Sequence, residues 1–208
     1  MSVNTSAELV YKQGLASYNG SVENLDWDDI QAALSGDEAA FERLVRRYQE
    51  QIAQLCWRFS RDSSVCERLV QDTFVEAYLS LKSYKAKGPF GGWLKKIATR
   101  VGYRFWKEQD KARHLVPLDD IDLAAKENEQ EIEPEKAAEI LHSILARLDS
   151  KERLVLTLMY FEDCTVREIA ERTGWTRAGV KMRAMRARKK LKKIAEREKI
   201  LEKLEWMQ

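Results

Sequence analysis

The 208-residue chain is poor in residues that interrupt helices and in residues that build cross-linked or metal-bound frameworks. Nine glycines and three prolines favour long helices with few turns. The three cysteines, Cys56, Cys66 and Cys164, are too few and too irregularly spaced for a disulfide framework or a zinc site, so we expect buried thiols. Neither His114 nor His142 has paired carboxylates at metal-ligand spacing, and we expect no cofactor.

Long apolar runs are also missing. No stretch approaches the roughly 18 apolar residues of a membrane span, and the chain does not begin with a charged-then-apolar leader. We therefore expect a cytoplasmic protein without membrane insertion.

The net charge of +2 is small, but the charges are segregated along the chain. Residues 1–40 hold seven acids and one lysine, residues 82–113 hold ten bases and two acids, and residues 117–139 hold nine acids and two bases. Blocks of alternating sign indicate separate basic faces joined by an acidic connector.

Apolar residues recur at helical spacing along most of the chain, and no segment sustains the alternation of a strand. The sequence predicts an all-α protein of two small helical domains joined by a flexible acidic linker, with a helix-turn-helix in the second domain. We expect a weakly structured arm over 1–24, the first domain over 25–113, the linker over 114–133, the second domain over 134–195 and a helical tail over 196–208.

Helix boundaries follow from caps and breakers. Ser35, Ser64 and Ser150 are expected to cap helices, and Pro134 is expected to open one. Residues 88–92 (GPFGG) predict a loop, because three glycines and a proline in five residues disfavour a helix. The next helix is expected from about residue 93 to about residue 110.

The C-terminal stretch 165–193 predicts two short helices joined by a tight turn. Thr165 and Glu168 have the spacing of a capping box, Gly174 can end the first helix, and Thr176 can cap the second. Nine bases and no acid lie between residues 173 and 195. In a helix-turn-helix the second helix enters the major groove of DNA, where cations are attracted by phosphate. A solvated basic helix or a coiled-coil arm is the alternative for the charge run alone.

A second basic surface is predicted over residues 90–113, where cations and aromatic rings occur together. Leu94, Ile97 and Val101 belong to its buried stripe, whereas the cations fall on other faces of the helix. Cations beside stacking platforms suit single-stranded nucleic acid. For Trp93 and Trp106, a place in the core and a role at DNA are equally open.

The order of three segments resembles the bacterial sigma factors of the extracytoplasmic-function (ECF) group. The segments are LVQDTFVEAYLSLKSY (69–84), FGGWLKKIAT (90–99) and the stretch from 145 to 191 that contains the helix-turn-helix. The resemblance spans about residues 26–195. It implies a non-enzymatic subunit that confers promoter recognition on RNA polymerase, with one domain for the minus-ten element and polymerase clamp and the other for the minus-thirty-five element.

The resemblance also implies partners and site residues. The partners are core RNA polymerase, through its largest-subunit clamp and its flap, promoter DNA and an anti-sigma factor. Upstream-element contacts are expected from Thr176, Arg177, Lys181, Arg183, Arg186 and Arg188. Minus-ten contacts are expected from Trp93, Lys95, Lys96, Arg100, Arg104 and Lys107, and polymerase contacts from Glu67, Gln71, Asp72 and Glu76. The loop 85–92 matches the family's loop for a flipped base, a process that costs a few kcal/mol of stacking.

Several positions depart from the family pattern. Arg100 stands where the pattern usually has Asn, Arg104 where it often has Asp, and Arg68 where an acid is usual. Gly179 lies inside the predicted recognition helix, where Gly costs about 1 kcal/mol relative to Ala.

Two other function classes remain as alternatives. A helix-turn-helix regulator that is not a polymerase subunit explains residues 134–195 but gives no task to the basic aromatic helix. A nucleic-acid enzyme lacks a catalytic constellation in this sequence. Binding to core polymerase distinguishes the first alternative, and a nuclease or polymerase assay tests the second.

Overall fold

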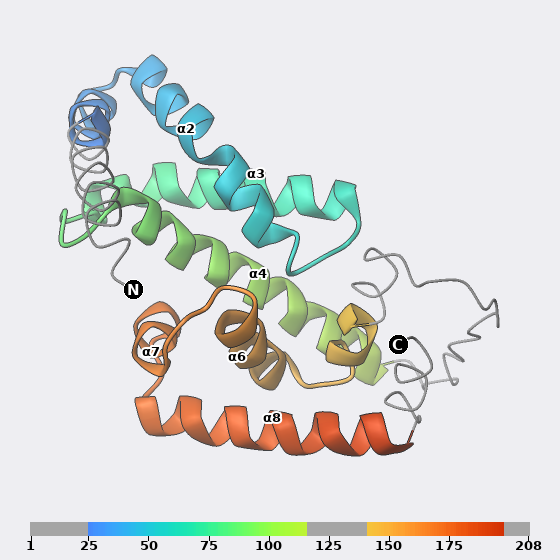
Figure 1. The fold of residues 1–208 in the computed structure, drawn as a ribbon. Helices are drawn as coiled ribbons and strands as arrows, with labels where there is room; N and C mark the ends of the chain where they lie inside the picture. The colour runs from blue at the N-terminus through green and yellow to red at the C-terminus, as the bar shows by residue number, and fades with distance from the viewer. Residues whose placement is uncertain (1–24, 116–140, 198–208) are drawn as a thin grey trace, which may run out of the picture. The chain divides into compact units, whose positions relative to one another are not determined.

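The computed structural model describes residues 25–115 and 141–197 of the chain (Figure 1). The predicted N-terminal arm, most of the predicted linker, the helix start at Pro134 and residues 198–208 of the predicted tail lie outside the described residues. The domain limits drawn from the sequence therefore stay predictions.

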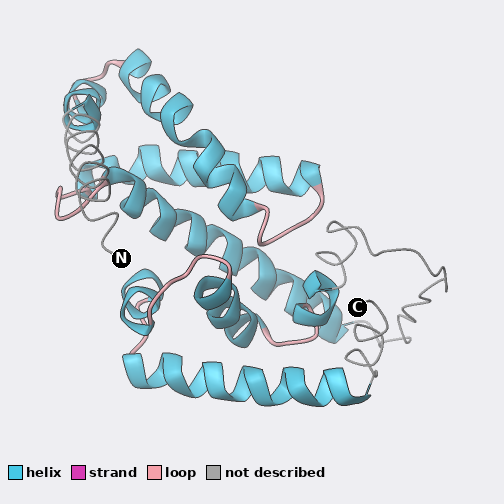
Figure 2. Cartoon of the chain, in the orientation of Figure 1, coloured by secondary structure: helices cyan, strands magenta, loops and turns pink. Residues whose placement is uncertain are grey.

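Helices and loops account for all of the described residues, and none of these residues is in a strand (Figure 2). A helix over 25–34 precedes the labelled elements. These are α2 (Glu38–Cys56), α3 (Ser63–Ser80), the short 3₁₀ helix η1 (Leu81–Ser83), α4 (Phe90–Leu115), α6 (Ser150–Tyr160), α7 (Val166–Thr173) and α8 (Arg177–Arg197). The prediction of an all-α protein is confirmed.

The described residues fall into two compact units. One contains residues 25–56 and 67–98, and the other contains residues 57–66, 99–115 and 141–197. Helix α4 begins in the first of these units and ends in the second, whereas α3 begins in the second and ends in the first.

In the first unit, an ion-pair network joins the helix over 25–34 to α2. Arg47 Nη2 lies 2.8 Å from Asp29 Oδ2, Arg43 Nε lies 2.8 Å from Asp29 Oδ1, and the hydroxyl of Tyr48 donates to buried Asp26. Burial acts to raise the pKa of Asp29, but the two guanidinium groups outweigh it and hold this pKa below its usual value. The network gives the buried carboxylates the charged partners that they need.

Three helix starts differ from the sequence expectation, in which a serine supplied each cap. Asp37 accepts from the amide of Ala40, Asp62 accepts from the amides of Ser64 and Val65, and Asp149 accepts from those of Lys151 and Glu152. The predicted caps Ser35, Ser64 and Ser150 are therefore wrong. The capping carboxylates also place a negative charge at the positive end of the helix dipole.

The helix expected from residue 93 instead begins at Phe90 and includes Gly91 and Gly92. Pro89 precedes it, and its carbonyl accepts from the amides of Gly92 and Trp93. Gly91 meets a steric need here, because a Cβ at this position would lie 2.7 Å from Tyr48 Cε1. Close packing on α2 thus overrides the low helix propensity of glycine.

In the second unit, α7 and α8 form the predicted helix-turn-helix. Thr165 and Glu168 form the capping box of α7, and Gly174 ends α7 with a φ of +74° in the left-handed region. Leu145, Leu148, Leu156 and Ala187 form a buried cluster that packs α8 on α6 and on the segment before α6, in which residues 141–145 are helical. Phe161 and Leu191 lie at the edge of this cluster.

Candidate nucleic-acid interface

The residues predicted to contact upstream DNA lie at the start and along the first half of α8, and most of them are exposed. Thr176 caps the helix, since its Oγ1 accepts from the amide of Gly179 at 3.1 Å. Thr176, Arg177, Lys181, Arg186 and Arg188 are exposed, whereas Arg183 is half-buried. The helix therefore presents cations near the end that meets base edges in helix-turn-helix proteins.

Two of these arginines have specific partners within the protein. The guanidinium carbon of Arg183 lies 4.3 Å from the ring centroid of Trp175, in the turn before α8. Arg188 Nε donates to the hydroxyl of Tyr160 at the end of α6, at 2.8 Å. Sequence periodicity gave no sign of either contact.

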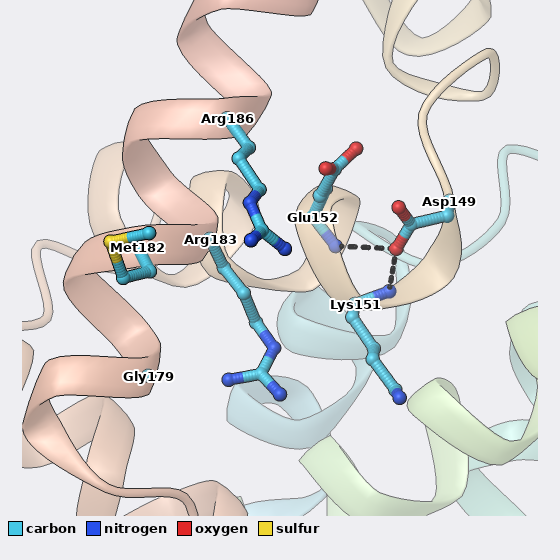
Figure 3. Close-up of a pocket in the computed structure, with 7 residues that line it drawn as sticks. All are labelled: Asp149, Lys151, Glu152, Gly179, Met182, Arg183 and Arg186. Atoms are coloured by element: carbon cyan, nitrogen blue, oxygen red, sulfur yellow. Dashed lines mark hydrogen bonds between the residues drawn. The ribbon is translucent and has the colours of Figure 1, made fainter.

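One cation of α8 serves to hold α8 against α6. Lys190 Nζ lies 2.6 Å from Glu152 Oε2 and 3.4 Å from Asp149 Oδ2. Glu152 is only 5% exposed, and its burial, together with the neighbouring Asp149, raises the pKa of its carboxyl. The same two acids line a pocket toward which Arg183 and Arg186 extend from α8 (Figure 3).

The basic surface on α4 is exposed along most of its length. Lys96, Arg100, Arg104 and Lys107 are exposed, Lys95 is half-buried, and Lys107 Nζ lies 5.9 Å from the ring centroid of Tyr103. The structure separates the two tryptophans of this segment. Trp93 is half-buried, whereas Trp106 is 1% exposed and its Nε1 donates to the carbonyl of Phe59 at 2.8 Å, which makes it a core residue.

The loop before α4 combines exposed residues with a rigid aromatic base. Residues 85–89 are exposed, and Ala86 has a φ of +49°, a conformation that is uncommon for a residue with a side chain. The hydroxyl of Tyr84 donates to the carbonyl of Gly88 at 2.7 Å, and the Tyr84 ring contacts those of Phe90 and Trp93. The aromatic contacts fix both ends of a short loop that carries Lys85 and Lys87.

The face of α3 predicted to bind polymerase exposes Glu67, Gln71 and Asp72, while Glu76 is half-buried. Val75, Tyr78 and Leu79 lie on the same helix and are 57%, 46% and 76% exposed. Sequence reasoning had passed over these three apolar residues. Exposed apolar side chains beside an acidic-polar pair are typical of a protein-binding surface.

Across residues 25–115 and 141–197, no group of three or more His, Cys, Asp or Glu side chains could hold a metal ion. No helix in this part of the chain is long and apolar enough to cross a membrane.

Comparison with known proteins gives two family matches along the chain. Residues 44–112 match the family sequence model described as Sigma-70 region 2, and residues 138–191 match the one described as Sigma-70, region 4. The first match includes the candidate surfaces on α3 and α4, and the second includes the helix-turn-helix.

Curated relatives match over most of their length. The RNA polymerase sigma-H factor of Pseudomonas aeruginosa is 30% identical over 179 residues, which cover 79% of this chain and 90% of the relative. The ECF RNA polymerase sigma factor SigW of Bacillus subtilis is 28% identical over 178 residues, covering 79% and 93%. Among solved structures, CnrH in complex with the cytosolic domain of CnrY matches with a TM-score of 0.55 and 27% identity, covering 83% of this chain and 97% of that chain.

Proposed function

The chain belongs to the ECF group of bacterial RNA polymerase sigma factors, and we propose from its surfaces how it carries out promoter recognition. In this proposal α8 meets the upstream promoter element in the major groove. The exposed cations of α4 and the loop over 85–89 meet the minus-ten region. The family consists of polymerase subunits rather than enzymes, and a protein with this role acts in the bacterial cytoplasm.

The observation that carries the DNA assignment is the helix-turn-helix whose second helix exposes Arg177 and Lys181 in its first two turns, with exposed Arg186 further along. Side chains at this position of a recognition helix reach base edges and phosphates. Lys190 is excluded from the assignment, because its ammonium group binds Glu152. Upstream specificity is thus proposed to lie in the first turns of α8.

The proposed polymerase-binding face lies on α3. Gln71 and Asp72 supply polar contacts, and exposed Val75 and Leu79 supply apolar area that a partner would cover. Arg68 and Glu67 stand one turn earlier on the exposed part of the same helix.

A third proposed partner is an anti-sigma factor. The solved relative CnrH was captured in a complex with the cytosolic domain of CnrY, which supports a further protein partner for the present chain. A candidate partner should bind the purified chain and lower its transcription activity. Binding without any loss of transcription would count against an inhibitory partner.

Reconstituted transcription tests the proposed function. Core RNA polymerase is assayed with and without the full chain on a library in which the upstream and minus-ten positions are randomised. Transcription that requires both the chain and a defined pair of elements is expected. Promoter binding by the chain with no effect on core polymerase would favour the separate-regulator alternative.

A further inference from the structure

Gly179 is the third residue of α8, at a position where glycine is unfavourable. A helix-interior glycine costs about 1 kcal/mol relative to alanine. Its backbone gives no reason for the choice, because among the described glycines only Gly36 and Gly174 have a positive φ. Gly179 must therefore be explained by what surrounds it.

The space beside Gly179 is occupied by another side chain of the same helix. A Cβ at this position would lie 2.8 Å from Nη1 of Arg183 and 3.0 Å from Oγ1 of Thr176. At less than 3.0 Å one of the two groups must move, so alanine at this position would displace the guanidinium group, which is the flexible end of the Arg183 side chain. The missing side chain leaves a slot in which Arg183 folds back toward the start of α8 (Figure 3).

Trp175 provides a second contact to the Arg183 guanidinium. The guanidinium carbon lies 4.3 Å from the centroid of the indole ring, close enough for cation–π attraction. Trp175 is itself fixed in the turn, since its amide donates to Thr173 Oγ1 at 3.3 Å. Arg183 thus contacts the indole ring of Trp175 and fills space that a side chain at position 179 would need.

The two acids that line the pocket beside Arg183 are paired with a lysine instead. Asp149 and Glu152 line the same pocket, but both carboxylates are bound by Lys190, at 3.4 Å and 2.6 Å. Within the described part of the chain Arg183 forms no ion pair. Its N–H groups are therefore not committed to a carboxylate of the residues that the structure describes.

We propose that Gly179 and Trp175 are positioning residues that hold Arg183 as a specificity-determining residue for the upstream promoter element. This inference rests on the proposed promoter-recognition function. A guanidinium stacked on a ring keeps its edge for bidentate hydrogen bonds, as to O6 and N7 of guanine, and Lys cannot reproduce this geometry. Fixing the side chain before binding also removes part of the entropy cost of ordering it.

The test compares variants of the full chain in complex with core polymerase on the randomised promoter library. Arg183→Ala and Arg183→Lys should each reduce the preference for one upstream base pair by about 5-fold or more, because Lys keeps the charge without the planar fork. Gly179→Ala and Trp175→Leu should weaken the preference at that same base pair, and Trp175→Phe should retain part of it. The double variant of Gly179→Ala with Arg183→Ala should lose no more than Arg183→Ala alone.

Two controls separate positioning from other effects. Lys193→Ala removes one exposed charge near the C-terminal end of α8, and it should leave the base preference unchanged. Thermal unfolding should show that Gly179→Ala does not lower Tm, so that its loss of selectivity is not a loss of fold.

The outcomes are distinguishable. If Arg183→Ala weakens transcription equally on all sequences, or if Gly179→Ala keeps the wild-type preference, the positioning proposal is overturned while the sigma-factor function stands. If the wild-type chain supports no core-dependent transcription, the proposed function fails and the inference fails with it.

Discussion

The backbone of Gly102 in α4 lies directly against the ring of Phe59, and a Cβ on Gly102 would come within 2.3 Å of Phe59 Cγ. Phe59 in turn packs on Trp106, with ring centroids 4.6 Å apart, and its carbonyl accepts the indole N–H. The close approach of α4 to residue 59 therefore depends on a position without a side chain.

Gly102→Ala is predicted to destabilise the protein, because the added methyl group must force the buried ring or α4 to move. The expected loss in the free energy of unfolding is about 3 kcal/mol, at the upper end for overpacking a core. Urea denaturation measures it. Gly92→Ala is the matched control in α4, since no atom lies within 4 Å of its Cβ position, and it should leave the free energy of unfolding unchanged or raise it. Equal effects of the two substitutions would contradict the steric explanation.

Charge reversal on α3 should separate the chain from core polymerase. The double variant Gln71→Lys with Asp72→Lys is expected to abolish core binding without unfolding the protein, because both side chains are exposed. Asp28→Lys with Gln31→Lys makes the same change in charge at exposed positions of another helix and should keep core binding. Calorimetry or a gel-shift with core polymerase measures both. Wild-type affinity of the α3 variant would remove α3 from the polymerase interface.

Lys181 tests whether an exposed cation of α8 reads a base or a phosphate. Lys181→Ala should change the preferred upstream sequence, with an effect of about 1–3 kcal/mol at one base pair. The promoter library gives the preference directly. A uniform loss across all sequences, with the slope of affinity against salt concentration reduced by about one, would place Lys181 on phosphate instead.

His142 should make stability depend on pH under mildly acidic conditions. Burial, followed by the charges of Arg153 and Arg61, lowers the pKa of His142 to about 4. The pKa of His142 in the folded state lies below its usual value near 6.5, so the unfolded chain binds a proton here at a higher pH than the folded protein does. The folded protein is therefore not destabilised by His142 above about pH 6.5, and it loses stability as the pH falls from there toward 4.

His142 remains partly exposed, so we expect a loss of about 1–2 kcal/mol rather than the full shift. The His142→Gln variant keeps an acceptor for Arg153 Nη2, which lies 2.8 Å from His142 Nε2, but cannot titrate. Urea unfolding from pH 7 to pH 4 should therefore show a shallower decline for this variant. Parallel curves for the two proteins would assign the decline to carboxyl groups.

The helix-turn-helix was predictable because its determinants are local. The capping box of Thr165 with Glu168 and the left-handed glycine at 174 each act within a few residues of the chain. The helix starts at residues 37, 62 and 149 were missed for a related reason. Serine and aspartate are almost equally favoured as caps, and sequence alone did not rank an aspartate against a serine one or two positions away.

The internal partners of the cations on α8 were not predictable from sequence. A run of Lys and Arg looks uniform, and the structure assigns different neighbours to its members only through packing. Lys190 faces a buried glutamate of α6, and Arg183 faces the ring of Trp175. Both contacts depend on how α8 crosses the preceding helices, which periodicity does not give.

The three cysteines have a practical consequence for experiments in solution. Cys56, Cys66 and Cys164 are 1%, 7% and 4% exposed, so alkylating reagents meet almost no accessible sulfur in the folded state. Thiol modification requires access, and each sulfur therefore reports the rate at which its own surroundings open. A single cysteine introduced on the surface could be labelled selectively in the wild-type background. The slow modification of the native thiols would meanwhile measure the rate of local unfolding around each of them.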